Sequence, residues 1–137
     1  MPKVIAPRTH GVLDYLVVVL LALAPALFGF SGAPEVLART LAGAYLFITL
    51  FTAFPLGVVK FIPFPVHGMI EAVAGVAALA APWLFGFADD QPAARNFFVF
   101  LGAMELIVFA LTDWRAAQSA GAAGDVGGAG PASAGRR

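Results

Sequence analysis

Apolar residues fill four segments of the chain, at about residues 11–30, 36–54, 66–85 and 94–114. Each segment comes close to the roughly 20 residues that a helix needs to cross a hydrocarbon core about 30 Å thick. A soluble four-helix bundle would show a polar stripe at helical period, but the first and third segments are apolar on every face over much of their length. The pattern therefore predicts an all-α protein with four transmembrane helices.

Two charged residues, Arg39 and Glu105, weaken the apolar pattern of the second and fourth segments. The composition still favours a membrane protein, because only 12% of the residues are charged, about half the roughly 25% found in soluble domains. The net charge is zero and no basic stripe is interleaved with aromatic residues, which excludes nucleic acid as a partner. The absence of cysteine excludes disulfides, thiolate metal sites and thiol redox catalysis.

The four segments belong to one predicted transmembrane domain, residues 1–115. The first segment is longer than the apolar core of a secretory signal, and Asp14 interrupts its start, so we expect a retained helix. Residues 116–137 are mainly Ala, Gly and Ser. Such a composition cannot bury enough apolar surface to fold, and it predicts a disordered tail.

Lysine and arginine residues near the predicted helix ends are distributed unevenly between the two sides of the membrane. Four share one side and two share the other: Lys3, Arg8, Lys60 and Arg115 against Arg39 and Arg95. Cytoplasmic helix ends carry the excess of positive charge, so both termini are predicted to be cytoplasmic. We expect a multi-pass protein in the plasma (inner) membrane of a bacterium.

The two halves of the chain repeat each other. At a shift of 57 positions, His10 aligns with His67 and Asp14 aligns with Glu71. Two Pro-x-x-Phe-Gly-Phe segments also align at this shift. The chain therefore consists of two copies of one unit.

Each predicted repeat, at about residues 8–55 and 65–115, is a helical hairpin. Because each unit has an even number of spans, the two copies run parallel, related by a pseudo-two-fold axis along the membrane normal. With two residues inserted, the second helices align so that Glu105 falls opposite Leu46.

Short motifs close the first helix of each repeat: Ala81-Pro82-Trp83 in the second copy and Ala24-Pro25-Ala26 in the first, each followed by Leu-Phe-Gly-Phe. In this order the chain resembles the SPW-repeat family of small integral membrane proteins, named for Ser-Pro-Trp, although Ala replaces Ser in both copies. The resemblance implies the fold and the membrane location. The family has no established biochemical activity, so it implies no catalytic residues. The repeat-motif residues are Pro25, Phe28, Gly29, Pro82, Trp83, Phe85 and Gly86.

Pro25 and Pro82 are expected to bend or end their helices, because proline cannot donate the i→i−4 hydrogen bond. Trp83 is expected to anchor the chain at the same membrane interface, and Trp114 at the opposite one.

His10 with Asp14, and His67 with Glu71, form a candidate polar cluster. The i,i+4 spacing places each pair on one helix face. The first interpretation is a pair near the helix start that satisfies a buried acid about one turn inside the span. The second requires the first and third helices to face each other. The four side chains then converge and could bind a divalent metal, relay protons or supply two axial histidines to a haem.

Glu105 is a candidate intramembrane proton site, because a carboxyl group near the middle of a span is costly and often functional. We expect it to form a hydrogen bond with a neighbouring helix, through Tyr15, Tyr45, Thr49 or Thr52.

Four glycines are predicted to allow close helix approach: Gly43, Gly68, Gly75 and Gly102. Gly68 and Gly75 share one helix face, which is either a packing surface or a homodimer seam.

The leading functional hypothesis is a non-enzymatic membrane protein, structural or partner-binding, with no predicted catalytic residue, metal or cofactor. Its expected partners are the lipid bilayer and either a second copy or another membrane protein. Two alternatives stay open: a small proton or ion transporter that uses Glu105 and the His/acid pairs, and a haem or metal protein ligated by His10 and His67.

Overall fold

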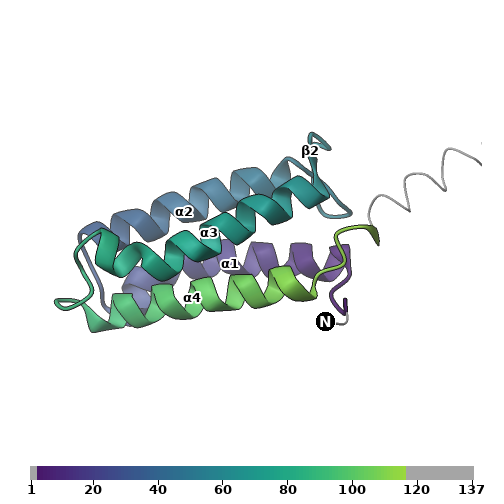
Figure 1. Cartoon of the computed structure of the whole chain (residues 1–137). Coiled ribbons are helices and arrows are strands. Elements are labelled where there is room, and N and C mark those ends of the chain that lie inside the picture. The colour runs from purple at the N-terminus through teal and green to yellow at the C-terminus, as the bar shows by residue number, and fades with distance from the viewer. Residues whose placement is uncertain (1–2, 117–137) are drawn as a thin grey trace, which may run out of the picture.

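The computed structural model describes residues 3–116, and in this part of the chain four helices form an antiparallel bundle (Figure 1). This confirms the all-α prediction, with the addition of two very short strands. The predicted tail lies outside the described residues, apart from Ala116. The elements are α1 Pro7–Phe28, α2 Ala33–Leu50, β1 Thr52–Ala53, β2 Ile62–Pro63, α3 Phe64–Leu84 and α4 Pro92–Leu111.

Every helix has a proline at its first or second position. Proline is favoured there because its fixed φ suits the helix and its missing N–H costs no hydrogen bond. All four helices therefore begin two to four residues earlier than the apolar pattern indicates. As a result, Asp14 and Glu71 lie roughly two turns inside α1 and α3, not one turn as predicted.

The C-terminal ends of α1 and α3 have similar structures. Neither helix ends at its internal proline: α1 continues past Pro25, and α3 past Pro82. In each case a glycine with φ near 70° follows the helix, at Gly29 and Gly86. The next residue donates its N–H to the carbonyl of the proline, at 3.1 Å in α1 and 2.9 Å in α3. The left-handed glycine, which no L-residue replaces without strain, thus ends each helix.

α1 packs mainly on α2, and α3 mainly on α4, so the chain forms two helical hairpins. In the second hairpin the backbones approach closely, since a Cβ built on Gly75 would lie 3.2 Å from the Gly102 carbonyl oxygen. Gly68 and Gly75 are both buried within the chain, so the proposed homodimer seam is wrong. The packing role predicted for Gly43 is also wrong, because a Cβ there would meet nothing within 4 Å.

Three helices, α1, α3 and α4, are long and apolar enough to cross a membrane. α2 does not reach that hydropathy, since Glu35 and Arg39 lie in its first half. The outer surface of the bundle is nevertheless apolar on every helix, as expected of a surface that faces lipid. Its exposed side chains include Leu16, Val19 and Leu23 of α1, Val36 and Phe47 of α2, Met69 and Val73 of α3, and Phe100 and Ile107 of α4.

Two parallel pairings join the hairpins at the end where α1 and α3 begin. Thr52 of β1, after α2, pairs with Ile62 of β2, before α3. Ile5, before α1, pairs in the same way with Thr112, after α4. Each threonine is thereby held beside the first turns of a helix from the other hairpin.

Candidate functional site: a buried His/acid cluster

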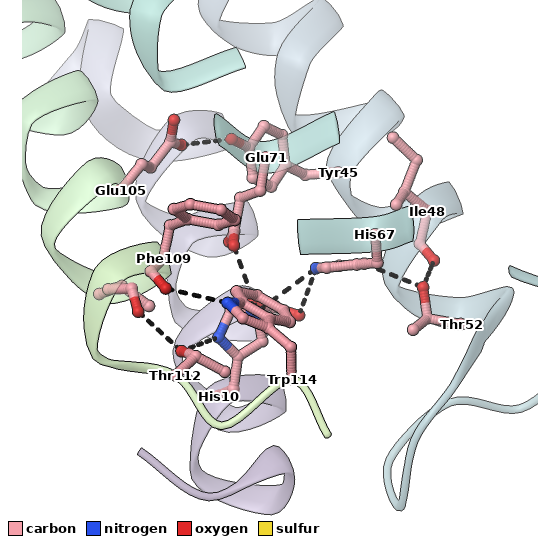
Figure 2. A network of polar contacts seen from close by, with 12 residues as sticks. His10, Tyr45, Ile48, Thr52, His67, Glu71, Glu105, Phe109, Thr112 and Trp114 are labelled. Atoms are coloured by element: carbon pink, nitrogen blue, oxygen red, sulfur yellow. Dashed lines mark hydrogen bonds and ion pairs between the residues drawn. The ribbon is translucent and has the colours of Figure 1, made fainter. Parts of the chain in front are cut away.

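The four residues of the predicted polar cluster meet in the structure. His10 and Asp14 come from α1, His67 and Glu71 come from α3, and all four are at least 94% buried. One ligand atom from each lies within 4.8 Å of all the others. Figure 2 shows the two imidazoles facing each other between α1 and α3. The second interpretation of the cluster required the side chains of α1 and α3 to converge, and they do.

His10 Nε2 lies at the centre of this cluster. It is 3.4 Å from His67 Nε2, 3.2 Å from Asp14 Oδ1 and 3.3 Å from Glu71 Oε2. The second oxygen of Asp14 lies 3.4 Å from His67 Nε2. The Asp14 carboxyl group therefore bridges the two imidazoles.

Two threonines fix the orientation of the histidine rings. The Thr52 hydroxyl donates to the Ile48 carbonyl at 2.6 Å, and the Thr112 hydroxyl donates to the Val108 carbonyl at 2.7 Å. Each hydroxyl has only one proton, so each Oγ1 must accept from the histidine beside it. The Nδ1 atoms of His67 and His10, at 2.9 Å and 3.0 Å, are thus the donors.

This arrangement leaves both Nε2 atoms as lone-pair acceptors when the rings are neutral. They face each other and two carboxyl groups that also offer lone pairs. Asp14 Oδ2 and Glu71 Oε2 have no hydrogen-bond donor although both are buried. The described lysines donate to backbone carbonyls outside the cluster, and Arg39 pairs with Glu35. Such a group of acceptors is unfavourable in a low dielectric unless a proton or a metal cation lies among them.

The separations suit a metal ion better than a haem. Ligand atoms on a tetrahedral ion with bonds of about 2.1 Å lie about 3.4 Å apart, close to the distances between His10 Nε2 and its neighbours. A haem with two axial histidines would place its macrocycle between the two nitrogens. At 3.4 Å, with Asp14 in contact with both, these atoms leave no room for it.

Aromatic rings cover the cluster at the end of the bundle. The Trp114 ring lies 4.8 Å from that of His10 and 4.7 Å from that of Phe64, between ring centroids. Its Nε1 donates to the Phe109 carbonyl at 2.9 Å. Trp114 therefore packs over the cluster, a role that the prediction of an interfacial anchor did not include. Trp83, at the other end of the bundle, is 62% exposed, as expected of an anchor.

Glu105 lies beside the cluster and not in the middle of its helix. It is six residues before Leu111 at the end of α4, or roughly 9 Å along the axis. Among the partners considered, the structure selects Tyr45, whose hydroxyl donates to Glu105 Oε1 at 2.5 Å (Figure 2). Tyr15 donates to the Leu56 carbonyl instead. The other oxygen of Glu105 is buried without a partner.

The repeat-motif residues do not take part in this site. Pro82 is 15 residues from His67 along α3, which corresponds to roughly 22 Å, and Pro25 is equally far from His10. Pro25 and Pro82 are buried, whereas Phe28, Trp83 and Phe85 are exposed at the opposite end of the bundle.

Sequence reasoning missed the threonines that bind the histidines. Thr52 and Thr112 are 60 positions apart and make the same two hydrogen bonds. An offset of 60, not 59, therefore relates the second helices here, and it places Glu105 opposite Tyr45 instead of Leu46. The shift of 57 also relates Lys3 to Lys60 and Ile5 to Ile62. This repeat is the sequence signal for the two strand pairings, in which Ile5 and Ile62 take part.

Comparison with known families agrees with these motifs. The family model of the SPW repeat domain matches residues 8–113, which contain all of α2, α3 and α4 and all of α1 except Pro7. The chain therefore belongs to the SPW repeat family. No curated protein and no solved structure matches it. The family and the three apolar helices support an integral membrane protein and indicate no specific activity.

Proposed function

We propose that this member of the SPW repeat family binds a divalent transition metal ion inside the membrane. His10, Asp14, His67 and Glu71 are the ligands, two nitrogens and two oxygens. Imidazole and carboxylate together suit borderline ions, of which zinc in tetrahedral coordination is the best match. The observation that carries the proposal is the convergence of both His/acid pairs, with their Nε2 atoms 3.4 Å apart.

Binding is favoured over conduction by the distribution of polar residues. The buried polar side chains are confined to the half of the bundle that holds the cluster and Glu105. In the other half the described core is apolar and closely packed, through residues such as Leu21, Phe30, Phe97 and Phe98. A cation that reaches the cluster thus meets an apolar barrier beyond it.

The proposed architecture is a tandem repeat of hairpins, about residues 8–55 and 65–115, within a domain of residues 1–115. The repeated strand pairings, threonine hydrogen bonds and helix ends support this. In this arrangement the pseudo-two-fold axis passes near the cluster, so each repeat supplies one histidine and one acid.

We also propose that α2 is the fourth span and that both termini are cytoplasmic. Val36 and Phe47 give α2 an apolar outer face. Its charged pair, Glu35 and Arg39 at 3.0 Å, lies in the first two turns, where long side chains can reach the interface. The metal site then lies in the cytoplasmic half of a bacterial plasma membrane.

Metal content of the untagged protein in mild detergent tests the proposal. After exposure to zinc and gel filtration, we expect about one metal ion per chain. His10→Ala and His67→Ala should each remove most of it, whereas Glu35→Gln, which alters a partly exposed acid of α2 outside the cluster, should not. Cobalt in place of zinc should give the absorption bands of a four-coordinate site. Metal-free wild-type protein, or equal loss in Glu35→Gln, would contradict the proposal.

A further inference from the structure

A cavity of about 220 Å³ lies between α1 and α4 and shares Asp14 and Glu71 with the proposed metal site. Three acids from three helices contribute to its lining: Asp14, Glu71 and Glu105. The remaining lining residues are apolar: Leu13, Leu16, Val17, Leu20, Met104 and Val108. The cavity thus combines carboxyl groups with walls that match hydrocarbon.

Glu105 has an oxygen available to a ligand in this cavity. Its side chain is only 3% exposed, Oε1 accepts the Tyr45 hydroxyl, and Oε2 has no hydrogen-bond donor. A buried carboxyl oxygen without a donor is unfavourable, because it has lost its hydrogen bonds to water and gained none in the protein. When Asp14 and Glu71 hold a metal ion, Glu105 remains the acid without a full set of partners.

The charge of the cavity specifies its ligand. No Lys or Arg is among the lining residues, and the described lysines donate to backbone carbonyls elsewhere. A ligand that supplies both hydrogen-bond donors and positive charge would complement these acids, since a buried carboxylate is stabilised by a paired cation.

The walls indicate how such a ligand arrives. Leu16 is 60% exposed on the outer surface of α1, and α1 contacts α4 less extensively than it contacts α2. The cavity therefore borders the lipid phase. A smaller cavity of about 90 Å³ lies between α2 and α3, beside Tyr45 and Glu71. It occupies the corresponding position in the other repeat, where Tyr45 stands in place of Glu105.

We propose that the cavity between α1 and α4 binds a lipid-soluble primary amine, a long-chain alkylammonium, with its ammonium group on Glu105 Oε2. The alkyl chain lies along the leucine, valine and methionine walls and extends into the bilayer. Unbranched methionine adapts its shape to such a chain. The choice of Glu105 among the three acids rests on the proposed function, although Glu105 is not itself one of the four metal ligands.

Covalent coupling locates the amine. The protein in lipid nanodiscs is treated with decylamine and a lipid-soluble carbodiimide. The carbodiimide activates a carboxyl group, the bound amine displaces the urea, and an amide forms on that acid. We expect the decylamide on Glu105 by peptide mass spectrometry, both with zinc and after chelation, and little on the exposed acids Asp89 and Asp90. Coupling to those exposed acids alone, or to Asp14 and Glu71 without Glu105, would overturn the assignment.

Affinity provides the second test. At ten times its Kd, decylamine should occupy roughly nine-tenths of the protein. Because it binds the folded protein, it should raise the Tm, whereas decanol and decanoate should not. Glu105→Gln and Val17→Phe, which fills the cavity, should abolish the rise. Val73→Phe makes the same change at an exposed position on α3 and should retain it. An equal response in Glu105→Gln would overturn the proposal, and a gel-filtration profile and a cooperative thermal transition like those of the wild type show that this variant is folded.

Discussion

At the scale of single residues, Thr52 and Thr112 determine which nitrogen of each histidine is free to bind a metal. Each hydroxyl donates to its own helix and accepts from Nδ1, so Nε2 faces the cluster. Partners that hold a ligating imidazole contribute about 10–100-fold to metal affinity. Thr52→Val and Thr112→Val should therefore each weaken zinc binding by that factor, measured by competition with a chelator of known affinity.

The matched control for these variants is Thr49→Val, at a threonine on α2. Its hydroxyl is fully buried but has no hydrogen-bond partner, so its removal should leave zinc affinity unchanged. A loss of affinity in all three variants would mean that the threonines act through packing and not through ring orientation.

The histidines were predictable from the sequence and the threonines were not, for a physical reason. His10 and His67 share a helix spacing with their acids and repeat at one fixed shift, so helix geometry alone groups them. Thr52 follows α2 and Thr112 follows α4. The turns before these two helices, residues 29–32 and 85–91, differ in length, so the threonines do not repeat at the shift of 57 that relates the histidines. Their histidine partners are set by strand pairing between the hairpins, which the spacing of residues within a single helix does not encode.

At the scale of the helices, packing within the second hairpin depends on Gly102. A Cβ there would lie 2.8 Å from the backbone nitrogen of Leu79, so α3 and α4 would have to separate. Gly102→Ala should lower the free energy of unfolding by about 1–3 kcal/mol, the usual cost of overpacking. Gly43→Ala adds its methyl group to open space and should be neutral or slightly stabilising, since alanine favours helix. Thermal unfolding in detergent compares the two variants, and equal destabilisation would contradict the packing assigned to Gly102.

The existence of the helices was predictable, but their boundaries were not. Hydrophobicity identifies the lipid-facing and core residues, so the apolar pattern stops at the first polar residues, even where the helix continues beyond them. The helices begin at Pro7, Ala33, Phe64 and Pro92, each with a proline at its first or second position, because backbone geometry determines the start. This difference moves Asp14 and Glu71 deeper, beyond the first turn in which the helix dipole acts.

At the scale of the whole molecule, the proposed topology requires α2 to cross the membrane. The native chain has no cysteine, so single cysteines can be labelled without background. In intact cells, Ser31→Cys and Asp89→Cys should react with a membrane-impermeant maleimide. Val58→Cys, at an exposed position between α2 and α3, should react only after permeabilisation. Equal labelling of positions 31 and 58 in intact cells would mean that α2 does not span, and the reverse pattern would invert the orientation.

The proposed metal site would also join the two hairpins, and it therefore predicts that global stability depends on the ion. α1 supplies two ligands and α3 supplies two, while most helix contacts lie within each hairpin. An ion that binds only the folded protein adds about 2.7 kcal/mol at a concentration of 100 times its Kd. Zinc should therefore raise the Tm of the wild type, and chelation should reverse the rise.

His10→Ala and His67→Ala should abolish the zinc-dependent rise in Tm, because each leaves three ligands and opens the coordination. Asp89→Asn, at an exposed acid in the loop between α3 and α4, is the control and should respond as the wild type does. A purely structural cluster predicts a different result: both histidine variants lose stability without zinc, and neither they nor the wild type respond to the metal. The size of the zinc-dependent shift, and not the stability of the variants alone, therefore separates a metal site from a polar packing cluster.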